Sequence, residues 1–101
     1  MTKAAYSSKE MSIAIQKKGI KAHRVMKFEK GGGWYWRYTF DIICRWLRET
    51  HGLHIYTFRI GEKWYYEIQV LKEGCTYSKV GGDSHDEALE SAIWCCINNL
   101  I

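Results

Sequence analysis

The amino-acid sequence predicts an α+β fold: an antiparallel sheet with the order helix, β-hairpin, helix, three-stranded meander, helix. Three observations predict it. Ser or Thr residues precede the segments with helical apolar spacing, apolar and polar residues alternate in the short runs between them, and glycines separate those runs. At 101 residues the chain has the length of a single domain, 1–101, with a basic helix and hairpin over 1–38 and a helix, meander and helix over 39–101.

A short helix opens the predicted order. Ser7 with Glu10 three residues later forms a capping box, and Gly19 is a natural left-handed cap at the other end. Alternation from residue 20 onward then predicts a half-buried strand. The inner side chains of that strand are Ile20, Ala22, Met26 and Phe28.

The stretch KGGGWYWRYTF, residues 30 to 40, predicts the loop of the hairpin and its returning strand, because glycines separate two alternating segments. Side chains of a strand point alternately to its two faces. We therefore expect Trp34, Trp36 and Tyr38 to face the core and Tyr35 and Arg37 to stand outward beside the lysines of the first strand.

The second half begins with Thr39, which caps a predicted helix that ends at Gly52. The runs LHIYTFRI, WYYEIQVL and CTYSKV follow as strands, joined by the tight connections GEK and KEG. Ser84 and Glu87 form a second capping box and start the closing helix. Its buried stripe is expected to consist of Leu89, Ala92, Ile93, Cys96, Ile97 and Leu100.

Charge and aromatic content indicate binding. The net charge of +4 is unevenly distributed, with eight basic and two acidic residues among the first thirty and seven against nine in the rest. Such a basic face attracts nucleic acid or an acidic protein surface, although lysines that merely solvate a helix and an edge strand give the same pattern. Five Trp and seven Tyr exceed what a core of this size hides. The candidate partner-binding residues are Lys21, Arg24, Lys27, Tyr35, Arg37, Arg45 and Arg48.

An enzymatic function has less support in the sequence than binding. Cys75 with His54 or His85 is one nucleophile and base to consider, and Asp41 with Glu49 or Glu67 is one carboxylate pair. These residues are scattered singly, and the glycine groups fit no phosphate-binding loop, so we expect no catalytic residue and no cofactor.

No metal, disulfide or membrane segment is expected either. The cysteines form no C-x-x-C motif, and a zinc site from His51, His54 and Cys75 has the wrong ligand spacing, so the thiols are predicted to be reduced. No apolar run approaches the length of a membrane span. The sequence therefore predicts a cytoplasmic protein.

Two family resemblances suggest a class of partner. From Phe40 onward, the order helix, three strands, helix and the segment KVGGDSHDEALESAIWCCINNL resemble the double-stranded RNA-binding domain. That family opens its last helix with basic residues that clamp phosphates, whereas this helix opens with Asp83, His85, Asp86 and Glu87.

The segment FDIICRWLRETHGLHI, together with DEALESAI and NLI, resembles small orphan proteins of phages and mobile elements of Bacteroides-type bacteria. This resemblance implies an inhibitor of host defence, of which anti-CRISPR proteins are one class, that binds a host protein or nucleoprotein complex. Nucleic-acid binding is the alternative function, and a homodimer is left open.

Overall fold

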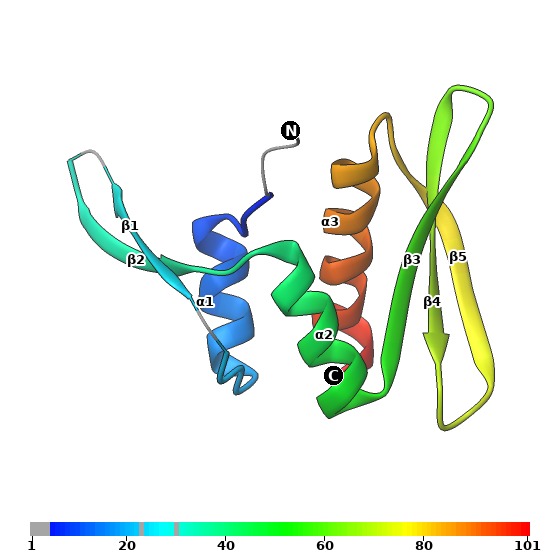
Figure 1. Cartoon of the computed structure of the whole chain (residues 1–101), viewed down its shortest axis with the longest axis horizontal. Helices are drawn as coiled ribbons and strands as arrows, with labels where there is room; N and C mark the ends of the chain where they lie inside the picture. The colour runs from blue at the N-terminus through cyan, green and yellow to red at the C-terminus, as the bar shows by residue number, and fades with distance from the viewer. Residues whose placement is uncertain (1–4, 23, 30) are drawn as a thin grey trace.

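The computed structural model describes residues 5–22, 24–29 and 31–101, with the backbone alone for residues 28 and 29. Its elements confirm the predicted α+β class and order. Figure 1 shows a three-stranded sheet on one side, helices beside it, and a separate hairpin that projects from the far end. The elements are α1 (Lys9–Lys17), β1 (Val25–Glu29), β2 (Gly33–Arg37), α2 (Phe40–His51), β3 (Leu53–Ile60), β4 (Lys63–Val70), β5 (Cys75–Gly82), α3 (His85–Cys95) and the π-helix Cys96–Leu100.

The helices begin at side-chain caps, as their sequences predict. In α2 the Thr39 hydroxyl accepts a hydrogen bond from the Ile42 amide at 3.3 Å, and Gly52 ends the helix in the left-handed region at φ 66°. In α3 the Ser84 hydroxyl accepts from the Glu87 amide at 3.1 Å. Both caps are therefore confirmed.

The cap of α1 corrects the prediction by one residue. Ser8, not Ser7, accepts from the Met11 amide, at 3.2 Å. Ser7 is buried, and its hydroxyl accepts from the Tyr38 amide at 2.9 Å and bonds the Ser12 hydroxyl at 2.6 Å. Ser7 thus joins the start of α1 to the end of β2, a long-range task that a local capping pattern does not reveal.

The strands form two separate antiparallel sheets, one of β1 and β2 and one in the order β3-β4-β5. The first strand begins at Val25 rather than at residue 20, because Ile20 is buried in the core beside the end of α1. Gly31 in the loop of the hairpin has φ 85°, and Gly33 at the start of β2 has φ 138°, backbone conformations that favour glycine.

The hairpin also corrects the predicted direction of Trp34. Ile20 and Ala22, two of the predicted inner residues, precede the strand, whereas Met26 lies opposite Trp36 and Phe28 opposite Trp34. The face they share is not the core, however, because 64% of Trp34 and 48% of Met26 is exposed. The side chain of Phe28 lies outside the described part of the chain. The hairpin projects beyond the helices, and only Tyr38, just past its base, is buried as predicted.

The core lies between the helices and one face of the three-stranded sheet. Leu53 and Ile55 of β3 and Ile68 of β4 are buried on that face, together with apolar residues of α1 and α2. The closing helix packs with the predicted stripe: Leu100 is half-buried, and the buried members are Leu89, Ala92, Ile93, Cys96 and Ile97. This packing leaves the opposite face of the sheet without a covering element among the described residues.

Candidate docking site

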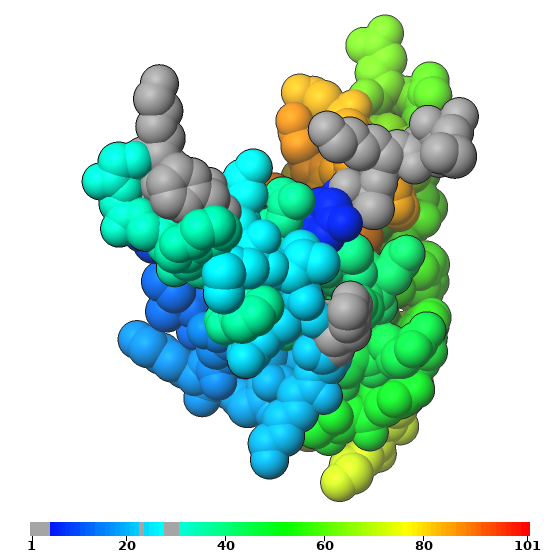
Figure 2. Space-filling model, turned by 60° about the vertical axis from the view of Figure 1, so that its left-hand side comes forward, coloured from blue at the N-terminus to red at the C-terminus, as the bar shows by residue number. Residues whose placement is uncertain are grey.

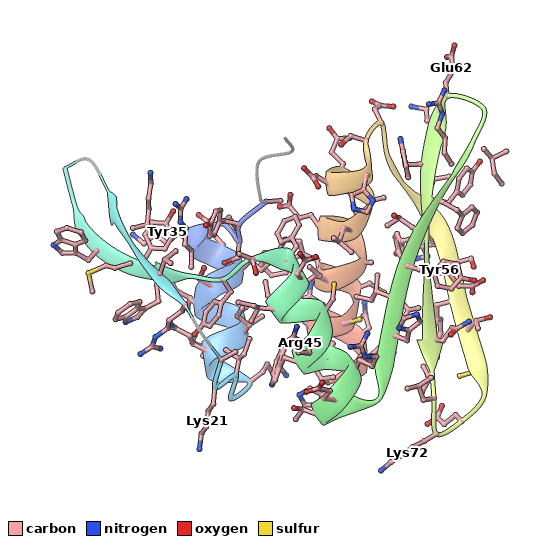
Figure 3. The ribbon with its side chains drawn as sticks, in the orientation of Figure 1. Lys21, Tyr35, Arg45, Tyr56, Glu62 and Lys72 are labelled. Carbon is pink, nitrogen blue, oxygen red and sulfur yellow. The ribbon has the colours of Figure 1, made fainter. Side chains whose placement is uncertain are left out.

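A hollow of about 350 Å³ lies between the loop after α1 and one side of α2. Lys21 and Ala22 contribute from the loop, and Ile42, Arg45, Trp46, Glu49 and Thr50 contribute from the helix. Helical spacing places residues 42, 45, 46 and 49 on a single face of α2, and the loop crosses that face. Figure 3 labels Lys21 and Arg45, which come from these two separate elements.

A smaller hollow of about 90 Å³ adjoins the first, since Ile42 lines both. Arg24 and Val25 line it from the start of β1, Arg37 and Thr39 from the end of β2, and Tyr6 from the segment before α1. We call the two hollows together the basic groove, defined by Lys21, Arg24, Arg37 and Arg45. Figure 2 shows this side of the molecule, where the hairpin in cyan lies beside α2 in green.

Aromatic rings hold two of the guanidinium groups of the basic groove. The Cζ atom of Arg24 lies 4.3 Å from the ring centroid of Trp36, and that of Arg37 lies 4.0 Å from the ring centroid of Tyr6. Tyr6 is itself fixed by a bridge to Thr39. Stacking on a ring restricts a guanidinium without neutralising it, so both groups keep their charge and their donors.

No carboxylate forms a salt bridge with the cations of the basic groove within the described chain. Lys21, Arg24, Arg37 and Arg45 take part in no salt bridge among the described residues. The pair Lys63–Asp83, at 2.6 Å, joins the start of β4 to the loop before α3. Glu49 is the acid among the lining residues. The Nε atom of Arg37 is buried and has no hydrogen-bond partner in the described part of the chain. The groove therefore presents a net positive charge, with four cations against the carboxylate of Glu49.

The structure brings together most, but not all, of the residues that the sequence singled out. Lys27 lies opposite Tyr35 on the hairpin. This pair shares a face with the pair Val25 and Arg37 and lies nearer the hairpin tip, so Lys27 and Tyr35 extend the groove toward the tip. Arg37 is half-buried against Tyr6 rather than outward, which corrects its predicted position.

Arg48 is outside the basic groove. It lies near Cys44 on a different side of α2, where its charge opposes the effects of burial and of Asp41 that raise the pKa of the Cys44 thiol to about 12. Arg48 therefore does not line the basic groove, although it lies one helical turn from Arg45.

Among the residues that the sequence did not single out for docking are Tyr6 and Ile42, which line the basic groove, and Trp36, whose ring lies under the guanidinium of Arg24. Each belongs to a different segment. The contact of Trp36 with Arg24 is recognisable in the sequence, because Arg24 directly precedes the strand that pairs with the strand of Trp36. Tyr6 has none, since its contact with Arg37 depends on how the chain before α1 crosses the base of the hairpin.

Three of the residues considered for catalysis form hydrogen bonds with other side chains. The Cys75 thiol donates a hydrogen bond to Glu73 at 3.5 Å, and His85 Nδ1 bonds the Thr57 hydroxyl at 2.6 Å. The Glu67 carboxylate accepts from Tyr56. Across the residues that the structure describes, no group of three or more His, Cys, Asp or Glu side chains is arranged to hold a metal ion.

No known protein family matches this sequence, and neither curated proteins nor solved structures gave a significant match. Within the described ranges, no helix combines the length and the apolar character needed to cross a membrane.

Proposed function

We propose that this protein is a small, non-enzymatic binding protein that docks through its basic groove onto an acidic surface of a partner protein or nucleoprotein complex. The observation that carries the proposal is the gathering of Lys21, Arg24, Arg37 and Arg45 around Ile42 without a salt bridge among the described residues. Like charges held close together repel each other in the free protein. A partner that supplies carboxylates or phosphates removes that repulsion on binding.

The hairpin suits the role of docking element. It projects from the body of the protein, and Trp34 at its far end is mostly exposed. Trp, Tyr and Arg are the residues that most often dominate the energy of protein interfaces, and here they alternate along one strand. The projecting shape allows the hairpin to enter a concave surface while the basic groove at its base contacts the rim.

The expected class of partner comes from the sequence resemblance. An origin in a phage or a mobile element, with action in the cytoplasm of the host cell, makes a host defence complex such as a CRISPR effector the proposed target. The basic groove is proposed to contact an acidic protein surface of that complex.

Nucleic-acid binding is the second candidate, and it is favoured by the order α2, β3, β4, β5, α3, which is also the order of the double-stranded RNA-binding domain. The start of α3 argues against that mode of binding. Lys63 is paired with Asp83, and Asp86 and Glu87 follow in the first turn, where the phosphate-clamping cations of that family would be needed.

The two candidates are separated by the salt dependence of binding and by sensitivity to nuclease. Fluorescence anisotropy with duplex and single-stranded RNA and DNA, at about 50 mM and about 200 mM salt, measures direct nucleic-acid binding. Affinity purification from host lysate, with and without nuclease, measures a protein partner. We expect a partner that survives nuclease treatment and is lost with Arg45→Glu but kept with Lys72→Glu, which changes the charge equally on the distant turn after β4 (Figure 3).

Strong, salt-dependent binding of a nucleic acid by the isolated protein, reduced by Arg45→Glu, would instead support the second candidate. Equal loss of the partner with both glutamate variants would show that net charge, rather than the basic groove, determines binding.

A further inference from the structure

The outer face of the three-stranded sheet carries apolar and aromatic side chains around a single carboxylate. The helices lie on the opposite side of this sheet (Figure 1), and the register places the outward residues of three strands next to one another. We define the outer face by Tyr56, Phe58, Ile60, Tyr65, Glu67 and Val80.

The rings of the outer face form a continuous surface. Tyr56 and Phe58 have ring centroids 6.2 Å apart, and Phe58 stacks on Tyr65 at 5.6 Å with an interplanar angle of 10°. At one end of the sheet, 60% of Ile60 and 57% of Val80 is exposed. Exposed apolar patches of this kind are uncommon on proteins without a partner and mark interaction sites.

Glu67 lies in the middle of this surface, on the central strand β4. Its carboxylate accepts hydrogen bonds from the hydroxyl of Tyr56 on β3, from the hydroxyl of Ser78 on β5 at 3.2 Å, and from the Gln69 amide at 3.4 Å. The donors come from all three strands, so the carboxylate is fixed in place. A carboxylate has about four acceptor positions, which leaves room for one more donor from outside.

This charge pattern decides between the occupants of the outer face. Nucleic acid fits poorly, because Glu67 repels phosphate and the cation at the end of β4, Lys63, is paired with Asp83. A second copy fits poorly as well. In a twofold face-to-face pair whose axis passes through the centre of the surface, two Glu67 side chains would be buried against each other.

We propose that the outer face binds a protein segment in which an arginine or lysine is flanked by apolar side chains. The cation meets Glu67, and the flanking side chains cover Phe58, Ile60 and Val80. Arginine suits the site best, since a guanidinium can bond the carboxylate while stacking on a neighbouring ring. This surface is separate from the basic groove, and its chemistry selects a cation where the groove selects an anion.

The test uses the full-length ¹⁵N-labelled protein and three synthetic peptides as probes. The first is Leu-Arg-Trp-Arg-Leu with blocked ends, and the others carry Gln or Glu in place of Arg. We expect the Arg peptide to shift the backbone amide signals of Tyr56, Glu67 and Ser78, with a dissociation constant of about 1 mM or lower. The Gln peptide should bind at least tenfold more weakly, and the Glu peptide should cause no shift.

Two variants complete the test. Glu67→Gln keeps the shape of the side chain and should abolish the preference for Arg over Gln, whereas Glu62→Gln removes the same charge from the turn before β4 and should leave it unchanged. The proposal is overturned by equal binding of the three peptides, by shifts confined to the hairpin, or by no shift at any attainable concentration. A dimer through this face, seen by sedimentation and lost with Phe58→Lys, also overturns it. None of these outcomes bears on the basic groove.

Discussion

The guanidinium of Arg37 lies over the ring of Tyr6, with its Cζ atom 4.0 Å from the ring centroid. The contact joins the segment before α1 to the end of β2. It is reinforced by the Ser7 amide, which donates to the Tyr38 carbonyl at 2.8 Å, and by the Phe40 amide, which donates to the Ala5 carbonyl at 3.1 Å. The base of the projecting hairpin, and with it one wall of the basic groove, is thereby fixed to the body of the protein.

The coupling between these two residues can be measured by a double-mutant cycle. Tyr6→Leu and Arg37→Met should each destabilise the protein, and urea unfolding of the two single variants and the double variant should give an interaction of about 0.5–2 kcal/mol. Additive effects would mean that the stacking contributes nothing in solution. Because Arg37 has this structural role, its substitution does not test binding alone.

Close packing of β5 on α3 depends on Gly81. A β-carbon added to Gly81 would lie 2.5 Å from the Cα atom of Ala88, so Gly81→Ala requires the helix to move away from the strand. We expect a loss of about 1–3 kcal/mol in the free energy of unfolding. Gly74→Asn is the control, because Gly74 has open space and Asn tolerates its φ of 68°. Equal losses for the two variants would contradict the packing described for α3.

Ile93 tests the register of the closing helix. Its side chain is fully buried, so Ile93→Ala should lower the free energy of unfolding by about 2–5 kcal/mol through loss of contacts and formation of a cavity. Ile60→Ala removes the same atoms from an exposed position and should change stability by less than about 0.5 kcal/mol. Chemical denaturation of the two variants side by side gives the answer, and similar values would show that the assigned face of the helix is wrong.

The buried thiols predict a loss of stability at alkaline pH. Burial raises the pKa of Cys44 and of Cys96 from 9.0 to about 12. Between these values the unfolded chain releases thiol protons that the folded chain keeps, so stability should fall as the pH rises above about 9. Denaturation midpoints from pH 7 to about 10.5 measure this, and the decline should be smaller in Cys44→Ala. A midpoint that rises over this range would contradict the burial of these thiols.

Local sequence signals predicted the helices and the meander well. Thr39, Gly52 and Ser84 act through neighbours within four residues, so their roles are visible in the sequence. The alternation on either side of the glycines likewise predicted the hairpin, although its first strand begins later than expected. These features depend on backbone hydrogen bonds that form within or between adjacent segments.

The direction of Trp34 and the setting of Arg37 could not be predicted in the same way. Alternation separates the two faces of a strand but does not say which face is covered, and here no described layer covers the side of Trp34. The contact of Arg37 with Tyr6 joins segments far apart in the sequence. The sequence was therefore sufficient to recognise the candidate docking residues as a basic and aromatic set. Only the fold shows which of them line the basic groove and that Arg48 lies outside it.

The central claim, that the basic groove and the adjoining hairpin face dock onto a partner, is tested most directly by photo-cross-linking in host cells. Benzoylphenylalanine replaces Tyr35 on the hairpin in one variant and Tyr77 on β5 in the other, which exchanges one ring for another in both. We expect the Tyr35 variant to cross-link to a protein, the Tyr77 variant to give no such product, and the cross-link to disappear when Arg45→Glu is added. Cross-linking from position 77 but not from position 35, or a product that persists with Arg45→Glu, would contradict docking through the groove.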